Sequence, residues 1–452
     1  MIEAPRTGFT GPDVPAASIY DQCVRCGLCL PTCPTYLETL TETSGPRGRI
    51  SLIKSVGEGG LDLLSPGFVH QMSECLDCRA CEAVCPSGVH YGQLIETART
   101  QVQRAAAPAA SPLARLARYF TLNVLFRNLA VMRAAAALLR FYQRSGLQTL
   151  ARKSGILARF KAGRNEALAP AISDRFFVPR DQRFAASGQR KCTVVLHAGC
   201  VMQVAFAHVN EASVRVLQRA GADVLVPSGQ GCCGAISVHA GEMPLGRDLA
   251  KRNIVAFEKS GADFYVINAA GCGSALKEYG ELFAQDDAWR ERAVAFSRAV
   301  RDITELLDRI GISRELGPID AVVTYQEPCH LVHAQRISAA PRRLLSAIPG
   351  LRLHEMNESS ICCGSAGIYN LTQPEMAARL QKRKVENIRA TDASIVATAN
   401  PGCALQVSAG LAQAGASNIR VKHIVELLDE SYAAYMEAGI RSRSSSAASS
   451  VA

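Results

Sequence analysis

Sixteen of the 17 cysteines in this chain fall into four regularly spaced sets, and no other feature restricts the fold as strongly. Two of these sets share one pattern. CVRCGLCLPTCP and CLDCRACEAVCP both read C-x2-C-x2-C-x3-C-P. The cysteines of the first run are Cys23, Cys26, Cys29 and Cys33, and those of the second are Cys75, Cys78, Cys81 and Cys85.

This spacing is typical of [4Fe–4S] binding in bacterial ferredoxins. Three thiolates on a tight loop can wrap one cluster, and the fourth, which precedes a proline, reaches the other cluster. We therefore predict one cluster on Cys23, Cys26, Cys29 and Cys85, and a second on Cys75, Cys78, Cys81 and Cys33. Structural zinc is the alternative, but zinc sites prefer ligand pairs separated by a longer loop.

The segment between the two runs indicates a helical domain. Apolar residues recur at nearly helical spacing at Ile50, Ile53 and Val56. Arg47 and Arg49 precede them. These arginines either lie near a cluster and raise its potential, or are solvated at a helix start.

A basic stretch follows. Between Thr97 and Asn165 there are 13 Lys or Arg residues and no Asp or Glu, with leucines and aromatic residues between them. A basic amphipathic helix of this kind could lie on an anionic membrane surface or pack against an acidic partner. It could also be a linker whose arginines face water. Nucleic acid is not expected as a partner, because no recognition module is present.

The C-terminal half is duplicated, and each copy contains adjacent cysteines followed by glycine, a CCG repeat. Corresponding cysteines lie 129 to 131 positions apart. They are Cys200, Cys232, Cys233 and Cys272 in the first repeat, and Cys329, Cys362, Cys363 and Cys403 in the second. The match extends to LAKR at 249–252 and LQKR at 380–383.

Each repeat predicts an α/β unit in which cysteines follow the ends of β-branched runs such as CTVVLHAGC and AVVTYQEPC. Loops at the carboxyl ends of parallel strands converge where such folds bind ligands. We therefore predict a four-thiolate metal site in each repeat: two further iron–sulfur clusters, or one cluster beside a zinc or an empty site. The remaining Cys192 starts a strand and is predicted to be core.

Two histidines follow Cys329 in the stretch CHLVHAQ. His330 and His333 could tune or ligate a cluster, move protons, or satisfy local hydrogen bonds. Lys277, Glu278 and Tyr279 follow Cys272, where they could shape the site.

The reduced state of so many thiols indicates the cytoplasm. The first 20 residues lack the basic and apolar regions of a secretory signal. No apolar run reaches the length of about 18 residues that a spanning helix needs.

Taken together, two ferredoxin runs followed by two CCG repeats resemble the iron–sulfur subunits of bacterial glycolate oxidase. The motifs that carry this resemblance include GPRGRI, GCGSALKEYG, CHLVHAQ, CCGSAG and TANPGC. The resemblance implies FAD-containing partner subunits that oxidise glycolate to glyoxylate, and D-lactate in some members. This chain would pass their electrons toward a membrane quinone, as a peripheral protein on the cytoplasmic face of the inner membrane. No catalytic residue is expected in this chain.

One departure bears on the chemistry. The full CCG pattern ends each repeat in C-x-x-C, whereas this chain has Ala269 and Asn400 at the penultimate positions. Four-thiolate clusters and electron transfer therefore fit better than the disulfide chemistry of heterodisulfide reductases. The alternatives are an iron–sulfur subunit of a D-lactate or anaerobic glycerol-3-phosphate dehydrogenase, and a heterodisulfide reductase-like subunit.

The predicted fold class is α/β with an α-helical part, and the chain divides into six parts. They are an N-terminal tail at 1–19, a helical domain with two [4Fe–4S] clusters at 20–100, a basic connector at 101–190, the first CCG domain at 191–315, the second at 316–432 and a disordered tail at 433–452.

Overall fold

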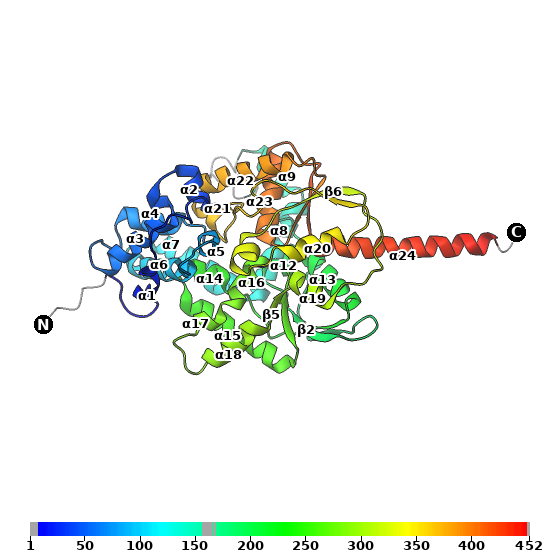
Figure 1. Ribbon diagram of the computed structural model, residues 1–452, viewed down its shortest axis with the longest axis horizontal. Helices are drawn as coiled ribbons and strands as arrows, with labels where there is room; N and C mark the ends of the chain where they lie inside the picture. The colour runs from blue at the N-terminus through cyan, green and yellow to red at the C-terminus, as the bar shows by residue number, and fades with distance from the viewer. Residues whose placement is uncertain (1–7, 156–165, 167–168, 450–452) are drawn as a thin grey trace.

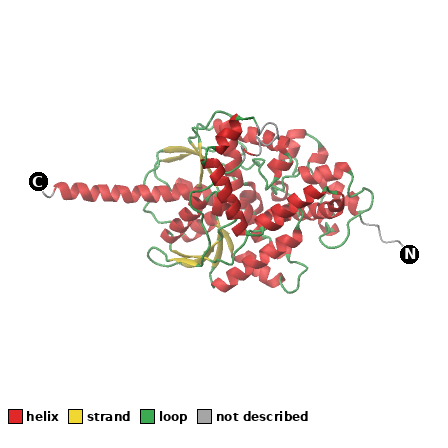
Figure 2. Ribbon diagram, turned by 180° about the vertical axis from the view of Figure 1, so that it is seen from behind, coloured by secondary structure: helices red, strands yellow, loops and turns green. Residues whose placement is uncertain are grey.

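The computed structural model describes residues 8–155, 166 and 169–449. Helices dominate it, and the strands form two separate small sheets (Figure 2). The helical N-terminal unit lies at one end and a long C-terminal helix, α24, projects from the other (Figure 1). The two sheets lie between them.

The N-terminal unit is helical, as the apolar spacing predicts. Its helices pack around a core that includes Ile50, Ile53, Val56 and Leu94. They are α1 (Ala17–Tyr20), α2 (Pro34–Thr39), η1 (Glu42–Ser44), α3 (Pro46–Gly57), α4 (Pro66–Glu74), α5 (Ala80–Ala83), α6 (Tyr91–Ala106) and η2 (Ala107–Ala109). We call this unit, residues 8–109, the dicluster domain.

The connector consists of consecutive short helices. They are α7 (Pro112–Tyr119), the π-helix η3 (Phe120–Phe126), α8 (Leu129–Arg144) and α9 (Leu147–Lys153). Helix α8 lies on the far side of the molecule in Figure 1 and on the near side in Figure 2. Its buried Met132 and Ala136 face the protein, so the opposite side of α8 is left to solvent.

The first CCG domain contains a five-stranded sheet with the order β1-β3-β2-β4-β5. All neighbours are parallel except β1, which runs antiparallel to β3. The strands are β1 (Gln182–Phe184), β2 (Cys192–Leu196), β3 (Ala222–Val226), β4 (Phe264–Ile267) and β5 (Val300–Asp302). The helices are α12 (Val201–Val204), α13 (Ala207–Arg219), α14 (Ala235–His239), α15 (Met243–Ser260), α16 (Ala270–Lys277), α17 (Tyr279–Leu282), α18 (Arg290–Ala299) and α19 (Ile303–Ile310).

The second CCG domain has a parallel four-stranded sheet with the order β7-β6-β8-β9. Its strands are β6 (Ala321–Tyr325), β7 (Leu351–Leu353), β8 (Ile395–Thr398) and β9 (Arg420–His423). Its helices are η4 (His330–Ala334), α20 (Ala339–Ser346), α21 (Tyr369–Thr372), α22 (Pro374–Arg389), α23 (Pro401–Gln413) and α24 (Ile424–Ser449). This strand order equals β3-β2-β4-β5 of the first domain, as expected of a duplication.

One hydrophobic core runs through both CCG domains. It contains Val194 and Tyr265 of the first domain together with Tyr325 and Leu428 of the second. Cys192 lies in this core at the start of β2, as predicted. The two repeats are therefore a single packed body rather than two beads on a linker.

Two parts of the structure differ from the predicted division of the chain. Strand β1 falls within the predicted connector but pairs with β3, because Arg183 bridges to Asp223 across the pair at 2.9 Å. The tail predicted to be disordered from residue 433 instead continues α24 to Ser449. Its backbone at Ala434 and Tyr435 packs so tightly on Gly317 that a Cβ there would clash.

Candidate iron–sulfur sites

Two sulfur-lined cavities lie side by side in the dicluster domain. Cys23, Cys26, Cys29 and Cys85 line the first, together with Cys81, Arg47 and Ile50. Cys33, Cys75, Cys78 and Cys81 line the second, together with Arg49 and Tyr91. The fourth cysteine of each run thus faces the cavity of the other run. This is the crossed arrangement that the spacing predicts for two [4Fe–4S] clusters.

Both cysteine loops curl in the same way. The third residue of each, Arg25 and Asp77, has a positive φ of 57° and 53°. The fifth, Gly27 and Arg79, follows with 85° and 62°. Residues of the left-handed region alternating with the cysteines turn successive side chains toward one point. Sequence spacing alone does not reveal that Arg79 takes a conformation that favours glycine.

The thiols of these cavities fit a cationic cluster. All 17 cysteines are free, so no disulfide competes for them. Burial, with the neighbouring Cys23 and Cys33, raises the pKa of Cys29 to about 11. Burial also raises the pKa of Cys78 and Cys81 well above the ordinary value. Such thiols ionise only when a bound cation compensates their charge.

Buried polar groups support the second cavity. Arg49 is 1% exposed and donates to Thr35 Oγ1 at 3.0 Å and to Glu74 at 3.0 Å. The hydroxyl of Tyr91 lies 3.6 Å from Cys75 Sγ. Arg47, at the first cavity, donates to the backbone oxygen of Arg25 at 2.9 Å. Both arginines that the sequence singled out therefore stand next to a cavity.

In the first CCG domain, the four cysteines follow three parallel strands. Cys200 follows β2, the Cys232–Cys233 pair follows β3, and Cys272 lies in α16 after β4. Cys200 Sγ and Cys232 Sγ are 3.7 Å apart. Hydrogen bonds from Cys200 and Cys233 hold the pKa of Cys232 well below its ordinary value, and Cys272 in turn hydrogen-bonds Cys233. The predicted set is therefore brought together.

In the second CCG domain, Cys329, Cys362, Cys363 and Cys403 occupy the matching positions after β6, β7 and β8. Hydrogen bonds from Cys362 and Cys403 lower the pKa of Cys363, and Cys329 lies against Cys362. A glycine with positive φ follows each pair: Gly234 at 84° and Gly364 at 87°. Only glycine adopts this turn without strain, which explains the third letter of the CCG repeat.

The two CCG sites differ in one buried charge. Lys384, 2% exposed, donates to the backbone oxygens of Glu358 at 2.6 Å and Ser359 at 3.0 Å. Burial lowers its pKa, against the pull of the thiolates of Cys363 and Cys362. Asn253 is the counterpart in the first repeat, and it binds the Cys232 backbone oxygen at 3.0 Å instead. The aligned stretches LAKRN and LQKRK contain this difference, which the sequence reasoning missed.

Asn400 stands where the full CCG pattern has a further cysteine. Its Nδ2 donates to Cys403 Sγ at 3.4 Å, and its Oδ1 accepts from the backbone N–H of Gly271 at 3.1 Å. The amide therefore links the ligand helices of the two CCG domains. It cannot serve as a fifth thiolate, in agreement with four ligands in each site.

The dicluster domain is packed directly on the second CCG site. Cys78 shares an apolar cluster with Cys362, and Cys329 packs against it. Tyr369 donates from its hydroxyl to the backbone oxygen of Glu74 at 2.7 Å. His330 Nε2 lies 2.8 Å from the backbone oxygen of Asp77. The sulfur sites of the two domains are thus neighbours across a buried interface.

A buried charge cluster, Asp77, Arg79, Glu96, His239 and Glu278, joins the dicluster domain to the first CCG domain. Arg79 lies 2.8 Å from Asp77, 3.1 Å from Glu96 and 3.4 Å from Glu278. Burial opposes the charge of His239, but hydrogen bonds to Asp77 and Glu96 raise its pKa to about 10. Two cations already balance these carboxylates, so the group is an ion-pair network rather than a cation site.

The residues after Cys272 shape the site in different ways. Tyr279 donates to the backbone oxygen of Cys233 at 2.8 Å. Glu278 belongs to the charge cluster, and Lys277 pairs with Glu305 at 2.7 Å, away from the thiols. His333 contacts the Ser360 backbone oxygen at 3.1 Å. Asp77, Glu96 and His239 carried no motif and were not anticipated.

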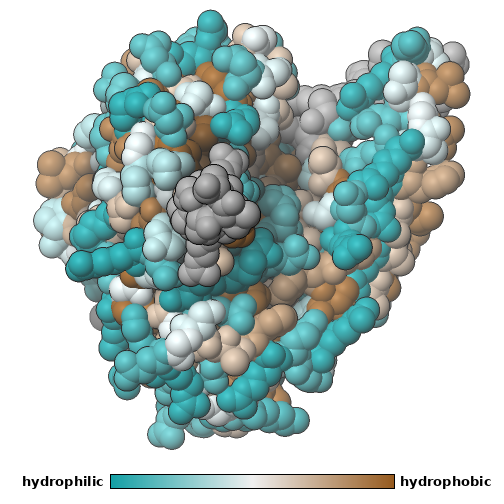
Figure 3. All heavy atoms as spheres, turned by 90° about the vertical axis from the view of Figure 1, so that its right-hand side faces the viewer, coloured by the Kyte–Doolittle hydropathy of each residue, from teal (hydrophilic) through white to brown (hydrophobic). Residues whose placement is uncertain are grey.

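The connector carries many of the exposed large apolar side chains. They are Leu113, Leu116, Tyr119, Phe120, Leu138, Phe141, Leu147 and Leu150. In Figure 3, brown patches border the predominantly teal surface. Within the described residues, no single helix has the length and apolarity to cross a membrane; Pro112–Phe126 and Leu129–Arg144 pass only as a pair bent by 105°.

Family models match most of the chain. A 4Fe-4S dicluster domain matches residues 19–89, and a cysteine-rich (CCG) domain matches 194–277 and 323–408. A model of the linker region of the glycolate oxidase iron-sulfur subunit matches 113–167. Together with the sulfur-lined sites, these matches define an iron–sulfur protein in which a dicluster domain precedes two CCG domains.

Whole-length relatives specify the family. The chain is 41% identical over 415 residues to a probable glycolate oxidase iron-sulfur subunit of Bacillus subtilis, covering 90% of this chain and 93% of that protein. It is 32% identical over 418 residues to the glycolate oxidase iron-sulfur subunit of Escherichia coli, covering 92% and 95%. The chain belongs to the family of glycolate oxidase iron–sulfur subunits. Part of it, 52%, is also 36% identical to 45% of a subunit of the fumarate reductase (CoM/CoB) of Methanothermobacter marburgensis.

Proposed function

We propose that this chain is the electron-transfer subunit of a glycolate oxidase complex. Partner subunits carrying FAD would oxidise glycolate to glyoxylate, or D-lactate, and this chain would pass the electrons toward a quinone-type acceptor. It would act as a peripheral protein on the cytoplasmic face of the membrane. The observation that carries this proposal is the packing of Cys78 against the second CCG site, which makes the sulfur sites contiguous.

The ligand sets follow from the four groups of thiols. Cys23, Cys26, Cys29 and Cys85 would hold one [4Fe–4S] cluster, and Cys75, Cys78, Cys81 and Cys33 the other. Cys200, Cys232, Cys233 and Cys272 would bind a third centre, and Cys329, Cys362, Cys363 and Cys403 a fourth. Bound clusters supply one-electron transfer. The protein supplies thiolates, buried charges and exclusion of water.

The heterodisulfide reductase alternative receives less support. Asn400 and Ala269 leave each CCG site with four thiolates, and both positions are filled by side chains with other roles. A related respiratory dehydrogenase with another substrate remains the competing assignment. Substrate choice rests with the partner subunits, so a comparison of glycolate, D-lactate and glycerol-3-phosphate in the purified complex separates these functions.

The test begins with metal content after anaerobic purification. Four [4Fe–4S] centres require about sixteen iron and sixteen sulfide per chain, and two require about eight. In the complex, Cys26→Ser is expected to abolish dye reduction downstream while substrate still reduces the flavin. Cys192→Ser, which changes the one cysteine outside the four sets, should leave both unaffected. Loss of flavin reduction in Cys26→Ser, or a colourless zinc protein, would contradict the proposal.

A further inference from the structure

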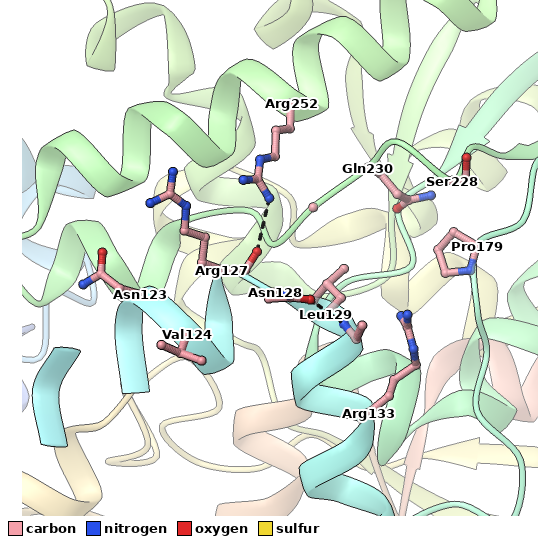
Figure 4. Close-up of a pocket in the computed structure, with 12 residues that line it drawn as sticks. Asn123, Val124, Arg127, Asn128, Leu129, Arg133, Pro179, Ser228, Gln230 and Arg252 are labelled. Atoms are coloured by element: carbon pink, nitrogen blue, oxygen red, sulfur yellow. Dashed lines mark hydrogen bonds between the residues drawn. The ribbon is translucent and has the colours of Figure 1, made fainter. Parts of the chain in front are cut away.

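A cavity lies where the connector bends against the first CCG domain (Figure 4). Its volume is about 1010 Å³, part of it open to solvent. The residues at the bend, Arg127 to Ala130, form one wall, and the loop at Ser228–Gly231 forms another. Three arginines line it: Arg127 from the bend, Arg133 from α8 and Arg252 from α15.

The positive charge of this cavity is only partly compensated. Arg127 lies 3.2 Å from Asp248. Within the described part of the chain, no carboxylate lies within 4.0 Å of Arg133 or Arg252. Arg133 donates to the Gln203 side chain at 3.1 Å, and Arg252 donates to the Arg127 backbone oxygen at 3.2 Å. Each guanidinium therefore keeps N–H groups for an anionic ligand.

Exposed apolar side chains flank the cavity on both arms of the bend. On α8, Ala130 lines the cavity, and Leu138 and Phe141 continue its helical stripe with 73% and 64% of their surface exposed. On the other arm, Leu116 and Phe120 are 63% and 53% exposed. Burying such side chains at a lipid interface is favourable, whereas leaving them in water is not.

We propose that the arginine cavity binds the phosphate headgroup of an anionic phospholipid, with the flanking apolar side chains at the acyl boundary. Guanidinium forks match phosphate oxygens, and the connector has 13 basic and no acidic residues between Thr97 and Asn165. This deepens the proposed function, since it specifies how the subunit meets its membrane. Gly231 lines the cavity and precedes Cys232, so docking brings the first CCG site to the membrane surface.

The test uses the full-length chain with its clusters in place and vesicles of phosphatidylcholine with or without phosphatidylglycerol. The wild-type chain is expected to float with the phosphatidylglycerol vesicles at low salt and to stay unbound with phosphatidylcholine alone. Arg133→Gln/Arg252→Gln should weaken binding about 30-fold, at about 1 kcal/mol for each guanidinium. Arg389→Gln/Arg420→Gln removes the same charge from exposed positions of the second CCG domain and should have little effect.

A second pair of variants tests the apolar contact. Phe141→Ser should weaken flotation, whereas Leu371→Ser, exposed in the second CCG domain, should not. Equal losses in the variant and control pairs would overturn the proposal. It would also be overturned if inorganic phosphate bound the cavity while no vesicle did, or if only an acidic partner protein bound. Iron content and flavin-driven dye reduction are measured in parallel, so failure here is distinguishable from failure of the electron-transfer role.

Discussion

His330 of the second CCG domain lies with Nε2 2.8 Å from the backbone oxygen of Asp77, in the cysteine loop of the dicluster domain. Burial, and the charge of nearby His239, lower the pKa of His330 to about 4. The ring is therefore neutral near pH 7, and the contact requires the tautomer with its proton on Nε2. A neutral donor thus holds two predicted cluster loops together without adding charge between them.

Removal of this donor should loosen the interface. His330→Ala is expected to increase hydrogen exchange in residues 75–85, because the Asp77 carbonyl loses its partner. The control is His333→Ala: its ring contacts Ser360 inside the second CCG domain at 3.1 Å. Mass spectrometry of peptides from the folded holoprotein reports the exchange. Equal protection of residues 75–85 in His330→Ala and wild type would count against the contact.

Lys384 predicts unequal reduction potentials for the two CCG sites. A buried ammonium beside the thiolates favours the more negative, reduced state of a bound centre. Lys384→Met should lower the potential of the second centre by about 60 mV or more, equivalent to about 1.4 kcal/mol for one electron. Lys382→Met is the control, since its side chain is 79% exposed. Potentiometric titration followed by electron paramagnetic resonance gives the values, and identical potentials would refute the assignment.

Asn400 is expected to stabilise the joint between the repeats. Asn400→Ala leaves the Gly271 N–H and the Cys403 sulfur without their partner. An unsatisfied buried donor costs about 1–3 kcal/mol, so the denaturant midpoint should fall. Asn370→Ala is the matched control, because this half-buried amide makes one 3.4 Å contact within the second domain. Equal midpoints for the two variants would remove Asn400 from this role.

Asp302 gives a pH-dependent prediction. It caps α19, and burial raises its pKa to about 6 although Thr304 donates to it. Because the folded state holds the proton more tightly than the unfolded chain does, stability falls as pH rises from about 4 to about 6. Asp302→Asn keeps a good cap without the charge. The Tm of Asp302→Asn should exceed that of wild type above pH 6, and the gap should narrow by pH 5. A gap independent of pH would contradict the reasoning.

Motif spacing predicted the sulfur groups and their positions after strands, because ligands to one cluster must recur at short intervals or at matching points of a repeat. The contacts between domains had no such signal. Arg79 meets Glu278 across 199 positions of sequence, and neither residue lies in a recognisable pattern. The helical course of α24 beyond residue 432 was also missed, because serine-rich composition outweighed the helix-forming run SYAAYMEA. The limits predicted for the domains stay a prediction.

The hydrogen bond from Tyr369 to Glu74 spans 295 positions of the chain. During synthesis, the wall that Tyr369 builds against the second cavity can close only after most of the protein has left the ribosome. A nascent dicluster domain therefore waits with that side uncovered, and timely delivery of iron and sulfide, with protection from oxygen, becomes a requirement of biogenesis rather than of the finished enzyme.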